Sequence, residues 1–445
     1  MPRSKTKTLT ERFLSLFTEV HPGEGYSTLI LCLSIFVLLT AYYIIKPVRE
    51  ALILAGVGSA EIKSYAAAGQ ALLLLVAVPL YGKLSSMYPR RRLINIVSMF
   101  FAGCLGLFYV LALLKVPIGV VFYLWVGVFN LMIPAQFWAF ANDSYSPREG
   151  KRLFVIIAFG ASAGAVFGSF ITGRLIQPLG VNQLMILSGT LLLFSLVLLN
   201  LVDTREKEQS DGTSERIKEI EEPLEKGNAF MIVFQHRYLL LIALLMLFLN
   251  WANTTGEYIL SRTIKAAAVT AIAAGSTGGM SEGQFIGKFY ADFFSVVNVA
   301  ALLFQLFFVS RILKHIGVRI ALLILPLIAL GGYAIIAFFP ILSIVRWAKT
   351  AENATDYSLQ NTVRQVLFLP TARAQKYKAK QAIDTFFVRT GDVLSALLVY
   401  AGTTWLAFQT KHFAFFNMGL VVVWFGLAFY VGKEYMRMTQ KNRRA

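Results

Sequence analysis

A row of polar side chains runs along one helical face of the segment from Pro340 to Pro370. Its members follow one another at steps of three or four residues, which places them on one side of an α-helix; they are Arg346, Lys349, Asn353, Asp356, Gln360 and Arg364. An ionisable group costs about 2.5 to 3.5 kcal/mol at the middle of a membrane helix, so the row requires a wet, shared interior. The alternative is an amphipathic helix that lies flat on a membrane surface.

Three other apolar segments also carry polar residues. These residues are Lys46, Arg49 and Glu50 in the first segment, Asn130, Gln136, Asn142 and Asp143 in the second, and Asn250, Thr254, Glu257 and Ser261 in the third. Arginine and lysine at low dielectric suit an anionic, especially a phosphorylated, ligand, and nearby carboxylates can hold these cations when the ligand is absent. The predicted ligand-binding residues are therefore Lys46, Arg49, Glu50, Asp143, Glu257, Lys349, Asp356 and Arg364. The alternative is that these charges pair only with one another as structural bridges.

The composition indicates a polytopic membrane protein, because 57% of the residues are hydrophobic and only 15% are charged. The two cysteines, Cys32 and Cys104, lie inside apolar runs, and the four histidines are scattered. We therefore expect neither a disulfide framework nor a metal site, and no cofactor. The absence of a nucleophile, base and orienter triplet argues against an enzyme.

Apolar runs of membrane-spanning length predict an all-α protein with 12 transmembrane helices in two pseudo-symmetric halves of six. The expected spans are 27–45, 64–81, 93–114, 117–141, 153–173, 182–201, 238–260, 285–309, 320–339, 341–369, 383–406 and 413–432. The predicted organisation is an N-terminal tail (1–26), a first half (27–201), a linker (202–237), a second half (238–432) and a basic tail (433–445). Gly160, Gly164 and Gly168 predict a small-residue face for close helix packing in the fifth span.

Most of the 42 Lys and Arg residues lie in the two tails and in alternate loops. Because basic residues are retained on the cytoplasmic side, this asymmetry predicts that both termini and the linker are cytoplasmic. The net charge of +18 then reflects membrane topology, so we expect a lipid bilayer and no nucleic acid as a partner.

An internal repeat supports the division into halves, because the run Gly82–Arg91 is echoed 228 residues later by Ser310–Arg319. Two parallel six-helix halves are typical of a transporter with its site near the midplane between them. The first copy resembles the Gly-x-Leu-x-Asp-Arg-x-Gly-Arg-Arg loop of the major facilitator superfamily, with Ser86 and Met87 in place of the acidic and basic pair. The residues expected to act in gating or structure are Gly82, Arg90, Arg91, Lys288, Asp292 and Arg389, with Lys288 and Asp292 as an ion pair.

Several runs resemble the ATP/ADP translocases of plastids and intracellular bacteria. They are Tyr42–Glu50, Phe137–Asp143 with Lys151 and Arg152, Tyr357–Leu359, and Arg389–Gly391. The resemblance implies the major facilitator fold and nucleotide exchange across a bacterial inner membrane, by a monomer. It also implies that Arg49, Asp143, Glu257 and Arg364 act in exchange, with the two acids orienting the two cations. Asp356 and Asp392 are acidic where the family has basic residues.

Three functions are compatible with these residues. The first is a transporter that works by alternating access and exchanges one nucleotide for another. The second is proton-coupled movement of a different anionic or phosphorylated metabolite, with Asp356 or Glu352 as the proton carrier. The third is a non-transporting membrane scaffold or receptor with the same fold, in which the linker binds a partner.

Overall fold

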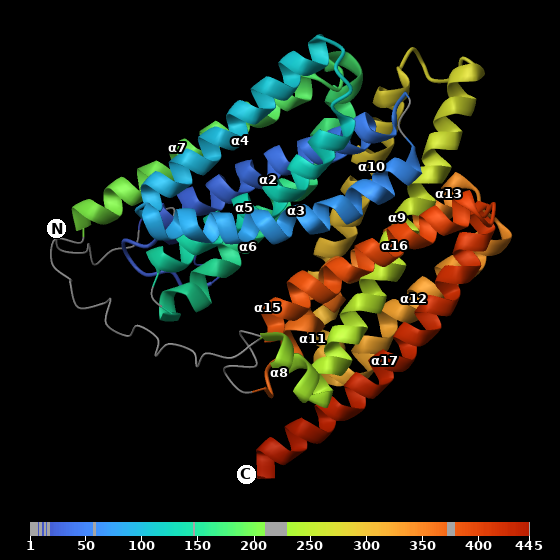
Figure 1. Ribbon diagram of the computed structural model, residues 1–445. Helices are drawn as coiled ribbons and strands as arrows, with labels where there is room; N and C mark the ends of the chain where they lie inside the picture. The colour runs from blue at the N-terminus through green and yellow to red at the C-terminus, as the bar shows by residue number, and fades with distance from the viewer. Residues whose placement is uncertain are drawn as a thin grey trace. The chain divides into compact units, whose positions relative to one another are not determined.

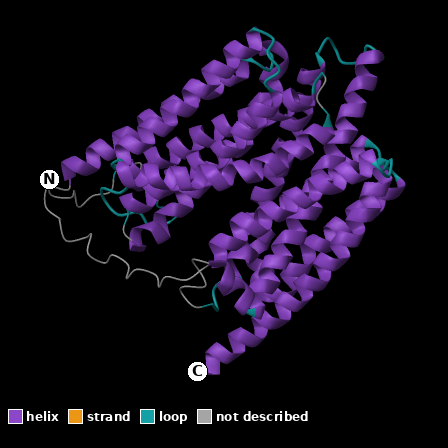
Figure 2. Ribbon diagram, in the orientation of Figure 1, coloured by secondary structure: helices purple, strands orange, loops and turns teal. Residues whose placement is uncertain are grey.

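The computed structural model describes residues 8, 11–12, 15, 18–56, 59–145, 147–209, 229–371 and 379–444. Within these ranges every regular element is a helix, and no strand occurs (Figures 1 and 2). The predicted linker falls largely outside the described residues, as does most of the predicted N-terminal tail. The prediction of an all-α protein is confirmed.

The chain forms two compact units, of which the first comprises Met1–Ile53, Leu73–Glu219 and Gly279–Ser295. Its helices are α2 (Gly25–Leu54), most of α3 (Ala60–Met87), α4 (Arg90–Leu113), α5 (Gly119–Ser144), α6 (Pro147–Leu179), α7 (Gln183–Gln209) and the first part of α10 (Glu282–Phe304). Aromatic rings fill much of its core, because Phe101, Trp125 and Phe129 lie with their ring centroids 5.4 to 5.5 Å apart. Such contacts add to the apolar area that the helices bury.

The small-residue face on α6 packs directly against the backbone of α2. A Cβ added to Gly160 would lie 2.6 Å from the Cys32 carbonyl oxygen, and one added to Gly168 would lie 2.6 Å from the Thr40 carbonyl oxygen. A Cβ added to Gly164 would overlap the Phe36 carbonyl. The sequence prediction of a close helix contact at these glycines is confirmed, since only hydrogen fits at the three positions.

The second unit comprises Leu54–Leu72, Ile220–Gly278 and Val296–Ala445. Its helices are α8 (Ala229–Gln235), α9 (Arg237–Ala273), α11 (Ser310–His315), α12 (Val318–Phe338), α13 (Leu342–Thr355), α14 (Asn361–Val366), α15 (Lys380–Ala382), α16 (Val388–Thr404) and α17 (Thr410–Arg444). α9 packs against α13, α16 and α17, and α12 packs against α13 and α17. This packing makes α9 the central helix of the unit.

Several π-helical turns interrupt helices of the second unit, and three of them lie wholly within the described residues. They are η1 (Gln305–Val309), η2 (Asp356–Gln360) and η4 (Ile383–Phe387). The turn η2 joins α13 to α14 without a break, so the helix runs continuously over residues 342–366. π-turns are rare and concentrate at functional sites, and η2 lies within the row of polar residues predicted from the sequence.

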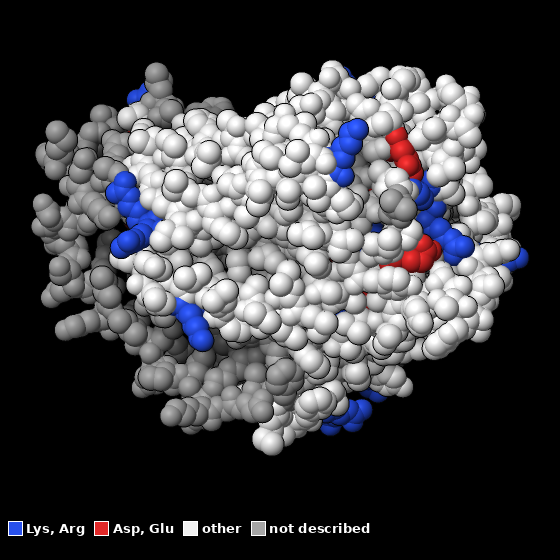
Figure 3. Space-filling model, turned by 45° about the horizontal axis from the view of Figure 1, so that its top comes forward, with Lys and Arg blue, Asp and Glu red and all other residues white. Residues whose placement is uncertain are grey.

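Ten helices of the described residues are long and apolar enough to cross a membrane. The two other predicted spans correspond to α13–η2–α14 and to α15–η4–α16, which carry several charged side chains. Figure 3 shows one face of the molecule, on which charged side chains are sparse over the described surface. These features are those of a multi-pass membrane protein.

Several helices extend beyond the predicted spans. α2 continues to Leu54 and α9 to Ala273, and α17 continues to Arg444. Lys46, Arg49 and Glu50 therefore lie inside α2, whereas the sequence prediction placed them at its end. α2 continues through these charged residues because their side chains have partners within the protein.

Candidate functional site

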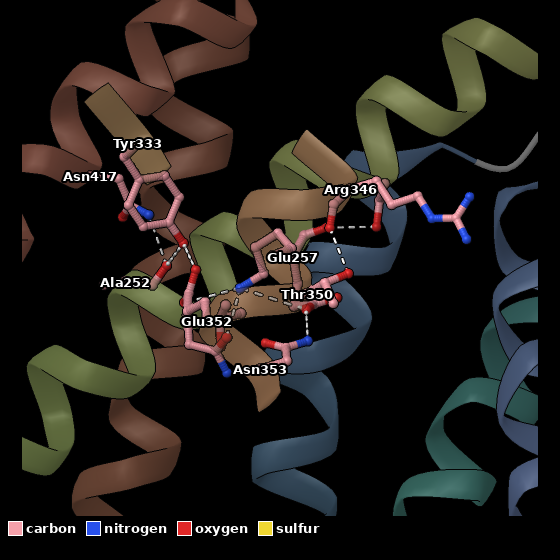
Figure 4. A network of polar contacts seen from close by, with 12 residues as sticks. Ala252, Glu257, Tyr333, Arg346, Thr350, Glu352, Asn353 and Asn417 are labelled. Atoms are coloured by element: carbon pink, nitrogen blue, oxygen red, sulfur yellow. Dashed lines mark hydrogen bonds and ion pairs between the residues drawn. The ribbon is translucent and has the colours of Figure 1, made fainter. Parts of the chain in front are cut away.

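A cluster of buried polar side chains joins α9 to α13 in the second unit (Figure 4). The two helices approach closely at Gly256, where an added Cβ would overlap the Tyr333 hydroxyl and lie 3.0 Å from the Lys349 ammonium. Only glycine leaves room for the cluster there. We name Asn253, Glu257, Tyr333, Lys349, Glu352 and Asn353 the lysine cluster.

The Lys349 side chain is at the centre of the lysine cluster and is 1% exposed. Its ammonium donates to Asn253 Oδ1 at 2.9 Å and forms an ion pair with Glu352 at 3.0 Å. A second carboxylate, that of Glu257, lies 3.7 Å from the ammonium and accepts a hydrogen bond of 3.1 Å from Asn353 Nδ2. A buried cation is tolerated only with such partners.

The two carboxylates around Lys349 differ in their surroundings. Glu352 is 4% exposed, and its second oxygen accepts a hydrogen bond of 2.8 Å from the Tyr333 hydroxyl. Glu257 has a side chain that is 25% exposed and makes the longer contact with the ammonium. Glu352 is therefore fixed in place, whereas Glu257 is the partner that can move away.

A layer of polar groups behind Glu352 keeps this side of the cluster rigid. Asn417 Nδ2 on α17 donates to the Ala252 carbonyl oxygen at 2.9 Å, and the Tyr333 hydroxyl lies 3.4 Å from the same oxygen. Arg346 belongs to the predicted polar row, but Figure 4 shows its side chain extending away from the labelled carboxylates. The side chains of the predicted polar row therefore do not all point into the lysine cluster.

Arg364 forms a separate ion pair in the second unit, outside the lysine cluster. Its Nη2 lies 2.5 Å from Asp384 Oδ1, and both side chains are between a quarter and a third exposed. Asp384 belongs to η4, so the pair connects α14 to this π-turn. The sequence predicted that Glu257 and Asp143 orient Arg49 and Arg364, whereas the structure pairs Arg364 with Asp384 and Arg49 with Glu50, and Glu257 contacts Lys349. Asp356 lies near the charges of Glu352, Lys349 and Arg364.

A third charged group of the unit surrounds Asp392 on α16, which is 6% exposed. Its Oδ1 accepts hydrogen bonds of 2.8 Å from Asn250 and 2.7 Å from Thr254. Its Oδ2 pairs with Arg389 at 3.1 Å. Asn250 and Thr254 thus bind α9 to α16, although the sequence grouped them with Glu257.

The predicted site residues of the first unit lie mainly on α2. Arg49 pairs with the adjacent Glu50, which is 1% exposed, and its guanidinium stacks 4.6 Å from the Tyr123 ring centroid. The Lys46 ammonium lies 3.9 Å from the Phe294 ring centroid. Asp143 lies near the end of α5 and is exposed. The structure thus holds Arg49 through a carboxylate on its own helix.

The residues predicted to act in gating have mixed surroundings. Gly82 lies inside α3, Arg91 Nε donates to Asn200 Oδ1 at 3.0 Å, and the Arg90 side chain lies outside the described part of the chain. The predicted ion pair between Lys288 and Asp292 is wrong: Lys288 Nζ is 3.4 Å from the Gly173 carbonyl oxygen, and the described ion pairs do not include these two residues.

Sequence reasoning missed three members of this region, namely Asn253, Tyr333 and Asn417, and named Asp384 only as part of the family resemblance. Asn253 precedes Glu257 by four residues on α9, so the helical period was a usable signal. Tyr333 and Asn417 are isolated polar residues in apolar spans, which is itself a mark of function in a membrane helix. Their partners could not be deduced from spacing, because they lie on other helices.

Comparisons with known proteins agree with this architecture. The sequence model of the Major Facilitator Superfamily matches residues 31–351, which is more than half of the chain. A curated relative, ADP,ATP carrier protein 1 of Chlamydia pneumoniae, is 22% identical over 342 residues, a match that covers 66% of this chain and 63% of the carrier. The chain therefore matches less than two thirds of the length of that relative.

Solved structures share the fold at low sequence identity. A bacterial homologue of the human lysosomal transporter Spinster is 13% identical, with a TM-score of 0.61 and coverage of 93% of this chain and 98% of its own. The nucleoside transporter NupG is 11% identical, with a TM-score of 0.59 and coverage of 93% and 99% respectively.

Proposed function

The chain belongs to the Major Facilitator Superfamily, and from this premise we propose that it is a secondary transporter that exchanges nucleotides across a membrane by alternating access. The ADP,ATP carrier among its relatives supports the choice of nucleotides. The excess of basic residues in the tails and alternate loops supports cytoplasmic termini, in a bacterial inner membrane.

The observation that carries the proposal is the buried ammonium of Lys349 between two carboxylates of unequal exposure and distance. A lysine in a membrane helix is costly, and a purely structural bridge would need only one carboxylate. The second carboxylate, Glu257, is partly exposed and is 3.7 Å from the ammonium. We assign Lys349 as the cation that binds the anionic group of the substrate.

Binding then proceeds by exchange of partners at Lys349. A phosphate oxygen displaces the Glu257 carboxylate and takes a charge-assisted hydrogen bond from the ammonium. Glu352 keeps its contact with Lys349 and its hydrogen bond from Tyr333, so the cation is never left without a partner. When substrate leaves, Glu257 returns, which avoids the large cost of an unpaired buried charge.

Lys46, Arg49 and Arg364 are proposed as further cations that contact substrate. Arg49 holds the Glu50 carboxylate and can exchange it for a phosphate by the same chemistry, whereas Arg364, which is held by Asp384, is proposed to contact another part of the substrate. Asp143 and Asp356 are proposed as further carboxylates of the substrate site.

Nucleotide exchange is tested with purified protein in lipid vesicles. Vesicles loaded with unlabelled ADP are expected to take up labelled ATP, and the label is expected to leave again when unlabelled ADP is added outside. Vesicles loaded with buffer alone measure uptake without exchange. If no nucleoside mono-, di- or triphosphate is taken up by either set of vesicles, the proposal is refuted.

A further inference from the structure

One buried glutamine side chain has no hydrogen-bond partner among the described residues. Gln360 on η2 is 2% exposed, and neither its amide nitrogen nor its amide oxygen is bonded. Buried polar groups are nearly always hydrogen-bonded, because an amide that leaves water without a partner loses free energy. The Gln360 amide therefore requires a partner that the described residues do not supply.

The groups beside Gln360 favour an uncharged ligand. Arg364 lies one turn further along, and its Nε is also buried without a partner, while its Nη2 is held by Asp384. Asp356 lies one turn earlier. Two carboxylates against one guanidinium disfavour a phosphate here, whereas the amide and the Nε together offer both donors and an acceptor.

We infer that Gln360 reads the hydrogen-bonding edge of a planar, uncharged base that presents a donor beside an acceptor, as adenine does. A glutamine amide pairs with such an edge through two hydrogen bonds. The inference rests on the proposed function, in which the phosphate end of the same ligand binds Lys349. Lys349 and Gln360 are eleven residues apart, about 16 Å of helix rise, which suits a ligand with two separate ends.

The test uses Gln360→Leu in the full-length protein. Leucine has a similar size and removes an unsatisfied amide, so the ligand-free melting temperature is expected to stay the same or rise. Wild-type protein is expected to bind ADP about tenfold more tightly than inosine diphosphate, and Gln360→Leu is expected to lose this preference with pyrophosphate affinity unchanged. Gln365→Leu is the matched control, because Gln365 is exposed and holds only Lys380.

Two results would overturn the inference. The first is a ligand-free melting temperature that falls further in Gln360→Leu than in Gln365→Leu, which would show that the amide has a structural role. The second is an unchanged preference for ADP over inosine diphosphate. If this preference is unchanged while labelled ATP is still exchanged, the recognition of the base by Gln360 is refuted and the proposed function stands. If uncharged adenosine binds in a Gln360-dependent way but no nucleotide is exchanged, base reading stands and the proposed function fails.

Discussion

Replacing Glu257 by glutamine is expected to tighten the binding of anionic substrate. The change keeps the shape of the side chain and its hydrogen bond from Asn353, and it removes the negative charge 3.7 Å from the Lys349 ammonium. An anion that binds Lys349 would then no longer compete with a carboxylate. The affinity for nucleotide is therefore expected to rise, and not to fall as it would if Glu257 contacted the substrate directly.

The size of the effect follows from the geometry. Two unit charges 3.7 Å apart attract by about 4.5 kcal/mol at an effective dielectric constant of about 20. A quarter of the Glu257 side chain is exposed, and exposed ion pairs contribute only about 0.2 to 1 kcal/mol. We take a value between these limits, about 1.4 kcal/mol, which corresponds to about a tenfold change in dissociation constant.

Isothermal titration of ADP into the purified variant measures this change. Glu434→Gln is the control, because Glu434 is paired with the exposed Arg437 at 3.9 Å on α17, and the same substitution there should leave ADP affinity unaltered. The reasoning is refuted if Glu257→Gln binds ADP as weakly as a variant that lacks the Lys349 charge, or if it binds ADP with wild-type affinity.

The remaining predictions concern the supports of the lysine cluster and the N-terminal segment. Gly256→Ala should lower the melting temperature by the equivalent of about 1 to 3 kcal/mol, because the methyl group overlaps the Tyr333 hydroxyl, whereas Gly331→Ala meets nothing within 4 Å and should be neutral. Tyr333→Phe removes a donor to the buried Glu352 and should cost about 1 to 3 kcal/mol in chemical denaturation; an unchanged midpoint would contradict the geometry. Burial raises the pKa of Glu11, but the backbone N–H groups of Thr8, Gly23 and Gly25 outweigh it and hold this pKa below its ordinary value of 4.5. The stabilisation is thus complete above about pH 4.5 and is lost as the pH falls through the lowered pKa. Hydrogen exchange at the Thr8 and Gly23 amides, corrected for the intrinsic rate, should therefore lose protection in acid, and Glu11→Gln should lose it at both pH values.

The fold was readily predictable because a chain that crosses a lipid bilayer must form its backbone hydrogen bonds internally. Apolar runs of spanning length can only be helices, and the small-residue face at Gly160, Gly164 and Gly168 could be assigned from spacing alone. The helix ends were less predictable. α2 passes Lys46 and Glu50 without stopping, because these charges find partners at the helix itself and in neighbouring rings.

The residues of the candidate site could be predicted from the sequence, but the ion pairs and hydrogen bonds between them could not. The periodic row on the tenth span contained Lys349, Gln360 and Arg364, but the partner of each depends on how other helices pack. Glu257 was grouped with Asp143 as an acid that orients Arg49 and Arg364, yet the cation that it contacts is Lys349. Tyr333 and Asn417 lie in spans whose apolar composition is typical of helices that face lipid. Their polar contacts are therefore visible only in the folded unit.

The partner of Glu50 also changes how Arg49 should be studied. Arg49→Ala would leave a carboxylate that is 1% exposed without its neighbouring guanidinium. Such a variant is expected to lose stability as well as substrate binding, since an uncompensated buried charge is costly. Arg49→Ala combined with Glu50→Gln is the appropriate comparison, because it removes both charges together.

The central claim is that the Lys349 ammonium binds the anionic group of the substrate. It is tested most directly by titrating ADP into Lys349→Gln combined with Glu352→Gln, in which both charges of the buried 3.0 Å ion pair are removed together. The account predicts that this folded double variant binds ADP at least tenfold more weakly than the wild type. Wild-type affinity for ADP in the folded double variant would contradict it.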